Sequence, residues 1–98
     1  MKQKKKKYSR NEIIAMMLKL EYAKNALEAH KNFNLAEVYV EEFLEKCSKE
    51  LADEKANKII REALEQRNYE LLLSAVDAEI ERLSIIKIKM LREKIISS

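Results

Sequence analysis

Apolar residues recur at steps of three and four along most of this chain, the spacing that places side chains on one face of an α-helix. In the first such stretch, about Arg10 to His30, the apolar face comprises Ile13, Met17, Leu20, Ala23 and Leu27, flanked by Ile14, Met16 and Ala26. The stretch opens with Ser9 and Glu12 at the spacing of a capping box, in which each side chain satisfies a bare backbone amide. The pattern predicts an amphipathic first helix.

The middle of the chain is harder to divide. Asn34, with Glu37 three residues on, predicts the cap of a second helix whose inward face is Leu35, Val38, Tyr39, Phe43 and Cys47. The apolar spacing weakens between Ser48 and Asn57, which indicates a kink or a short turn. The pattern leaves open whether residues 35–66 form one helix or two.

A long final helix is predicted after Asn68. Its main apolar stripe consists of Leu72, Val76, Ile80, Leu83, Ile86 and Met90. A second row, formed by Ile85, Ile88, Leu91 and Ile95, lies roughly 130° further around the helix. A helix that packs one face on a core has no use for a second row, so we expect these four residues to contact a protein partner or a second copy. Packing against the first helix is the alternative.

A short motif occurs twice, thirty-six residues apart: Lys31-Asn32-Phe33-Asn34-Leu35 and Arg67-Asn68-Tyr69-Glu70-Leu71. Asparagine tolerates left-handed backbone angles and caps helices, so both motifs are predicted turns of a repeated helix-turn-helix unit. Phe33, Ala36, Tyr39 and Leu44 make the first hairpin resemble a tetratricopeptide unit. Lys24 stands where that family has glycine, and two units are fewer than the usual three, so the resemblance implies hairpin geometry alone.

The chain of 98 residues contains no glycine and no proline, the residues that form most tight turns and sheet corners. We therefore expect an all-α fold: a small antiparallel bundle of three to four helices with a long C-terminal helix. The helical domain is predicted to span residues 9–98. Residues 1–8 are polar and are expected to form a disordered basic arm.

Charge is distributed unevenly along the chain. The first ten residues carry six cations, namely Lys2, Lys4, Lys5, Lys6, Lys7 and Arg10, although the net charge is only +3. Lysines on an arm can neutralise phosphates without a preformed geometry, which gives affinity for nucleic acid without sequence specificity. Tyr8 is placed to stack on an exposed base. A solubilising run, or a nuclear import signal in a eukaryote, is the alternative.

A second basic cluster, formed by Lys87, Lys89, Arg92 and Lys94, lies near the other end of the chain. The segment between the two clusters is acidic and would repel a polyanion, so nucleic acid is expected to contact an end of the bundle. With an even number of antiparallel helices both clusters lie at the same end, whereas with three helices they separate. The helix count therefore bears directly on function.

The sequence gives little support for catalysis or metal binding. His30 is predicted to interact with the end of the first helix and Cys47 to lie in the core, and a chain without glycine has no phosphate-binding loop. We expect no enzyme activity, no cofactor, no metal and no small-molecule substrate. A single cysteine and the absence of a long apolar run favour a cytoplasmic protein that does not enter a membrane. The abundance of Lys, Glu and Ile is in the direction seen in thermophile proteins, and an AT-rich genome, which also enriches Lys, Ile and Asn, is the alternative.

These observations predict a non-enzymatic accessory or adaptor subunit of a complex that handles nucleic acid, in replication, transcription or a viral genome protein. Its basic ends would bind phosphate, and an apolar helix face would bind a protein. The alternative is a protein-interaction module or homodimeric regulator without nucleic-acid contact.

Overall fold

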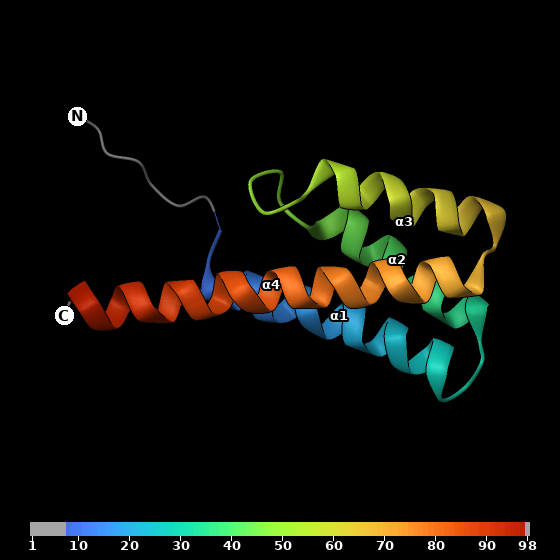
Figure 1. Ribbon diagram of the computed structural model, residues 1–98, viewed down its shortest axis with the longest axis horizontal. Coiled ribbons are helices and arrows are strands. Elements are labelled where there is room, and N and C mark those ends of the chain that lie inside the picture. Colours follow the sequence, from blue (N-terminus) through green and yellow to red (C-terminus); the bar gives the residue numbers. More distant parts are fainter. Residues whose placement is uncertain (1–7, 98) are drawn as a thin grey trace.

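Four α-helices and no strands make up residues 8–97, the part of the chain that the computed structural model describes. The helices are α1 (Arg10–Glu28), α2 (Phe33–Lys46), α3 (Glu54–Gln66) and α4 (Tyr69–Ser97). Successive helices run in opposite directions, so α1 begins at the end of the bundle where α4 finishes (Figure 1). The predicted all-α bundle is confirmed with four helices, and residues 35–66 belong to two of them. Residues 1–7 of the predicted arm lie outside the described residues.

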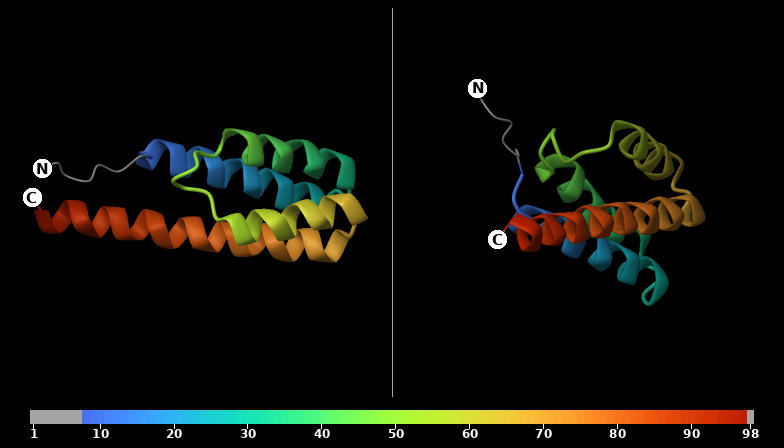
Figure 2. Two further views of the ribbon diagram at one scale, coloured as in Figure 1. Left: turned by 90° about the horizontal axis from the view of Figure 1, so that it is seen from above. Right: turned by 60° about the vertical axis from the view of Figure 1, so that its left-hand side comes forward.

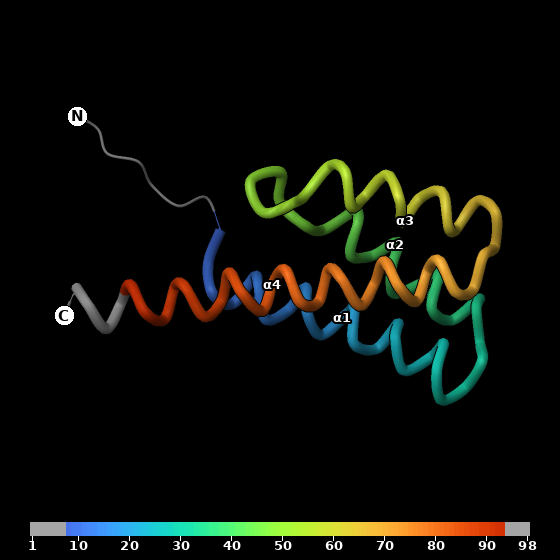
Figure 3. Tube along the Cα trace, viewed as in Figure 1, coloured from blue at the N-terminus to red at the C-terminus, as the bar shows by residue number. Residues whose placement is uncertain are grey.

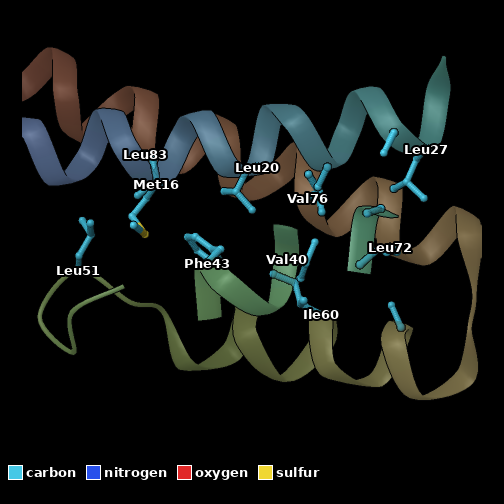
Figure 4. Close-up of a cluster of buried hydrophobic side chains, with 14 of the residues drawn as sticks. Met16, Leu20, Leu27, Val40, Phe43, Leu51, Ile60, Leu72, Val76 and Leu83 are labelled. Atoms are coloured by element: carbon cyan, nitrogen blue, oxygen red, sulfur yellow. The ribbon is translucent and has the colours of Figure 1, made fainter. Parts of the chain in front are cut away.

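All four helices contribute to one hydrophobic core (Figure 4). Its fully buried members include Leu20 of α1, Phe43 of α2, Ile60 of α3 and Leu83 of α4. Leu51, from the loop between α2 and α3, closes the core at one end. The predicted apolar stripe of the last helix is confirmed: its members are buried or pack against this core.

The inward face of α2 differs from the prediction. Leu35 and Val38 are 38% and 52% exposed, whereas Ala36, Val40 and Phe43 are buried. The larger side chains dominated the sequence pattern, but the small Ala36 belongs to the row that faces the core. The helix also begins earlier than expected, because Asn32 is its cap.

Both predicted turns form. In each, the residue with the left-handed backbone and the residue that caps the next helix are different, which the sequence did not indicate. The left-handed residues are the basic ones, Lys31 with φ 51° and Arg67 with φ 50°. The asparagine that follows each of them caps the next helix. The side-chain oxygen of Asn32 accepts from the backbone amide of Leu35 at 3.0 Å, and that of Asn68 accepts from Leu71 at 3.1 Å.

The two turns also contact each other, which makes the α1–α2 and α3–α4 hairpins a pseudo-symmetric pair. The Arg67 guanidinium lies 4.5 Å from the centre of the Phe33 ring, and the Lys31 ammonium lies 6.0 Å from that of Tyr69. Each hairpin thus places its cation over the aromatic residue of the other. The predicted repeated unit is present as two helical hairpins that contact each other through their turns.

The pseudo-symmetry fails in two places. First, α4 has 29 residues and α2 has 14, so the second half of α4 has no counterpart in the first hairpin. It runs beyond the other helices at one end of the bundle (Figure 2). Second, α1 packs closely against α4, whereas the corresponding pair, α2 and α3, scarcely touch.

Candidate functional site

The first candidate site is the end of the bundle where α1 begins and α4 finishes, which we call the basic pole. A hydrogen bond of 2.9 Å between the Lys24 ammonium and the Asp77 carboxylate fixes α1 and α4 in antiparallel register. Arg10 lies fourteen residues before Lys24, so this register places it level with about residue 91, fourteen residues after Asp77. Figure 3 shows the first turns of α1 beside α4. Arg10, Lys89 and Arg92 are exposed there.

The remaining predicted phosphate-binding residues have different environments. Lys87 is half-buried, because it lies on the side of α4 that faces the bundle. Lys94 belongs to α4, but its side chain is outside the described part of the chain. The residues of the N-terminal segment are outside it entirely, namely Lys2, Lys4, Lys5, Lys6 and Lys7. The structure therefore places Arg10 at the same end of the bundle as Lys89 and Arg92, and the lysines before Tyr8 lie outside the described residues.

Tyr8 is the point at which this segment joins the folded domain. Its side chain is half-buried and packs against the hydrophobic core, so only part of the ring is accessible for stacking on a base. The next residue caps α1, because the Ser9 hydroxyl accepts from the Glu12 amide at 3.1 Å. The Glu12 carboxylate accepts from the Ser48 amide at 2.8 Å, which ties the pole to the α2–α3 loop.

The predicted protein-contact row on α4 is partly accessible. Ile85 and Ile88 are 49% and 48% exposed, whereas Leu91 is half-buried. The side chain of Ile95 is outside the described part of the chain. The first row of α4 packs on the core, so the exposed isoleucines lie on the opposite side of the helix.

A second exposed apolar row, on α1, was not recognised in the sequence. Ile14, Leu18 and Tyr22 are four residues apart and are 40–49% exposed. The Tyr22 ring lies 5.3 Å from that of Tyr39, so the row continues onto α2. The four-residue spacing of this row is visible in the sequence. The row was not recognised because the neighbouring residues Ile13 and Met17 already accounted for the apolar face of the helix.

The second candidate site is a groove of about 1150 Å³ between α2 and α3. Its apolar lining is Leu44, Cys47, Ala52 and Leu64. Six carboxylates also line it, namely Glu37, Glu41 and Glu45 of α2 and Glu54, Glu62 and Glu65 of α3, against the three cations Lys49, Lys58 and Arg61. Acidic residues on both facing flanks repel each other, and charged residues at these positions leave little apolar surface to close the two helices together. From the sequence alone, these acidic residues indicate only a solvent-exposed helix face.

A buried ion pair supports one end of this groove. Glu79 is 1% exposed, and its carboxylate accepts from the Arg82 guanidinium at 2.6 and 3.0 Å. Arg82 also donates to the Leu51 carbonyl at 2.9 Å, so the pair anchors the α2–α3 loop on α4. The hydrogen bond to Glu79 raises the pKa of Arg82. This pair was not recognised in the sequence.

Cys47 and His30 lie in different environments. Burial, reinforced by the nearby Glu12 carboxylate, raises the pKa of the Cys47 thiol to about 11, which keeps it protonated at neutral pH and a poor nucleophile. His30 is exposed in the turn after α1. Within residues 8–97 no group of three metal-ligating side chains is present.

Comparison with protein-family models, with curated proteins and with solved structures finds no match to this chain. Among the described helices, none is both long enough and apolar enough to cross a bilayer.

Proposed function

We propose that this protein is a non-enzymatic accessory or adaptor subunit of a complex that handles nucleic acid. In this proposal the basic pole binds the phosphate backbone without sequence preference, and apolar helix surface binds a protein of the complex. The observation that carries the proposal is the number of helices. Because four antiparallel helices place the start of α1 at the same end of the bundle as the last turns of α4, Arg10 lies at the same end as Lys89 and Arg92.

The position of the cations also supports the proposal. Arg10, Lys89 and Arg92 are exposed at the pole, and the sequence before Tyr8 adds five lysines. Clustered cations displace the counterions condensed on a polyanion, and this release drives binding at low salt. The acidic groove between α2 and α3 disfavours wrapping of the nucleic acid around the body. Contact is therefore confined to the pole.

The test is fluorescence anisotropy with short single-stranded and double-stranded DNA and RNA across a salt series. The full chain is compared with a chain that lacks residues 1–7, which keeps Tyr8 and the Ser9 cap, and with Lys89→Gln/Arg92→Gln. Each lost phosphate contact should flatten the slope of log K against log salt by about 0.7–0.9. The control is Lys31→Gln/Lys58→Gln, which removes the same charge away from the pole.

A protein-interaction module without nucleic-acid contact is the second candidate function. The exposed isoleucines of α4 and the apolar row on α1 favour it, because contiguous apolar surface of this kind marks interaction sites. The same titration distinguishes the two functions. If the full chain does not bind nucleic acid at low salt, or if the control loses as much affinity as the pole variants, the nucleic-acid function is wrong and the interaction module takes its place.

A further inference from the structure

The two departures from pseudo-symmetry complement each other. The hairpin pair has a surplus half-helix at the end of α4 and an unfilled groove between α2 and α3. We propose that the groove of one copy receives the C-terminal half of α4 from a second copy of this chain. This proposal concerns self-association, and it is tested without nucleic acid. It assigns Lys89 and Arg92 to the groove of a second copy, so these two cations cannot contact a groove and a phosphate backbone at the same time.

The chemistry of the groove selects a cationic occupant with apolar side chains. Six carboxylates line it against three cations, and Leu44, Ala52 and Leu64 provide apolar surface between them. An incoming ammonium or guanidinium group offsets the local negative charge of these carboxylates.

The outward face of α4 has this chemistry. At about 100° per residue, Ile85, Ile88, Lys89 and Arg92 fall within an arc of roughly 100° on one side of the helix. All four side chains are exposed, and they lie on the side opposite the core-packed stripe. One helix face therefore combines two isoleucines for the apolar lining with two cations for the acidic walls.

The dimensions of the two elements also match. Residues 85–97 form 13 residues of helix, and α3 has the same number, which corresponds to about 20 Å for each. Because α4 is a continuous helix that packs on α1 and leads away from the bundle, its end does not reach the groove of its own chain (Figure 2). The occupant therefore comes from another copy.

The test is sedimentation velocity of the full chain over a concentration series, without nucleic acid. The helix variant is Lys89→Glu/Arg92→Glu and the groove variant is Glu41→Lys/Glu45→Lys. All four residues are exposed, so these changes leave the core intact. Each variant alone places like charges in the contact, and we expect association to weaken at least about tenfold. The matched control for the groove variant is Glu21→Lys/Glu28→Lys, exposed on α1, which should associate as the wild type does.

Mixing the two variants is the decisive measurement. In an equimolar mixture the acidic helix of one variant meets the basic groove of the other, and the unchanged helix meets the unchanged groove. Both contacts are then complementary, so the mixture should recover association that neither variant shows alone. This recovery also establishes that both variants are folded.

Three results would overturn the proposal. A wild-type chain that stays monomeric at every concentration shows that the groove does not receive a second copy. Association that survives the groove variant assigns the contact to another surface, such as the apolar row on α1. Loss of association on deletion of residues 1–7, with the helix variant unaffected, assigns the groove to the lysine-rich segment.

Discussion

Glu79 is the clearest case in this protein of a single side chain whose environment the sequence does not disclose. It follows Val76 by three residues on the core side of α4, where the stripe otherwise carries apolar residues, and it is 1% exposed. A buried carboxylate is tolerated only when it is paired and hydrogen-bonded. Arg82 meets this requirement, at a spacing of three residues, which is common on solvated helix faces and therefore uninformative in the sequence.

We expect Arg82→Met to reduce the free energy of unfolding by about 3–5 kcal/mol, because it leaves the Glu79 carboxylate buried without a partner. Urea unfolding of the wild type and of the variant measures this loss. The double variant Glu79→Leu/Arg82→Met should recover most of the loss, and a double variant as unstable as the single one would contradict this account.

Cys47 provides a second prediction, through its protonation. A pKa raised from 9.0 to about 11 leaves roughly 100-fold less thiolate in the folded chain than in the unfolded chain near pH 8. Alkylation by iodoacetamide should therefore be about 100-fold slower in the native protein than in urea. Because the folded thiol keeps its proton to higher pH than the unfolded thiol, this group lowers stability as the pH rises from about 9 to 11. Equal alkylation rates in the two states would contradict the burial of Cys47.

At the level of the elements, both turns reverse the chain direction between two helices, but their basic residues make different numbers of side-chain contacts. In both, a basic residue adopts a left-handed backbone conformation. The Lys31 ammonium lies over the Tyr69 ring. Arg67 stacks on Phe33, donates to the Asn34 side chain at 2.8 Å and lies 3.6 Å from the Glu37 carboxylate.

The matched substitutions Lys31→Gly and Arg67→Gly separate backbone strain from side-chain contacts. Glycine relieves the left-handed strain in both turns and adds the same entropy to the unfolded chain. Arg67→Gly also loses its contacts with Phe33, Asn34 and Glu37, so it should be less stable than Lys31→Gly by about 1–2 kcal/mol. Thermal unfolding of the two variants measures the difference. If the two variants are equally stable, the Arg67 contacts contribute nothing.

The elements themselves were largely predictable, and the errors have physical causes. Ser9 and Asn68 mark helix starts because their side chains bond to amides three residues ahead, a signal that depends on local spacing alone. Asp53 caps α3 in the same way and was overlooked because the apolar pattern around it is weak. On α2, Phe43, Tyr39 and Cys47 contribute to the core as predicted, whereas Leu35 and Val38 were assigned to the inward face wrongly. Which flank of a helix is buried depends on the helices beside it. The groove was not predictable for the same reason, because it is a missing contact between α2 and α3.

At the scale of the whole molecule, the helices are unequally held. The helix α3 has two buried side chains, Ile60 and Ala63, and packs closely only against α4, whereas α1 has six buried residues and packs against two helices. Stability against local opening follows the burial of apolar surface and the number of neighbours. The side of the bundle with the groove between α2 and α3 is therefore also the side that we expect to open most easily.

Hydrogen exchange should show this difference directly. We expect the amides of α3 to open with a free energy at least about 2 kcal/mol below that of α1, because a single buried leucine or isoleucine contributes that much. Exchange measured by NMR at low denaturant concentrations gives the opening energies of both helices. If α3 and α1 exchange together at the global rate, the bundle is a single cooperative unit and the unequal packing has no energetic effect.

The close pairing of α1 with α4 also has a consequence for how the chain is made. During synthesis on a ribosome, α1 and α2 emerge and can form their hairpin, but the side of α1 that packs on α4 has no partner until residues up to Leu83 have left the exit tunnel. For most of translation Met17 and its neighbours on that side are exposed to solvent. The acids of α2 and α3 and the Asn-capped turns are made in this interval, and they keep the unfinished chain charged and locally helical. The last helix then completes the fold by covering the first.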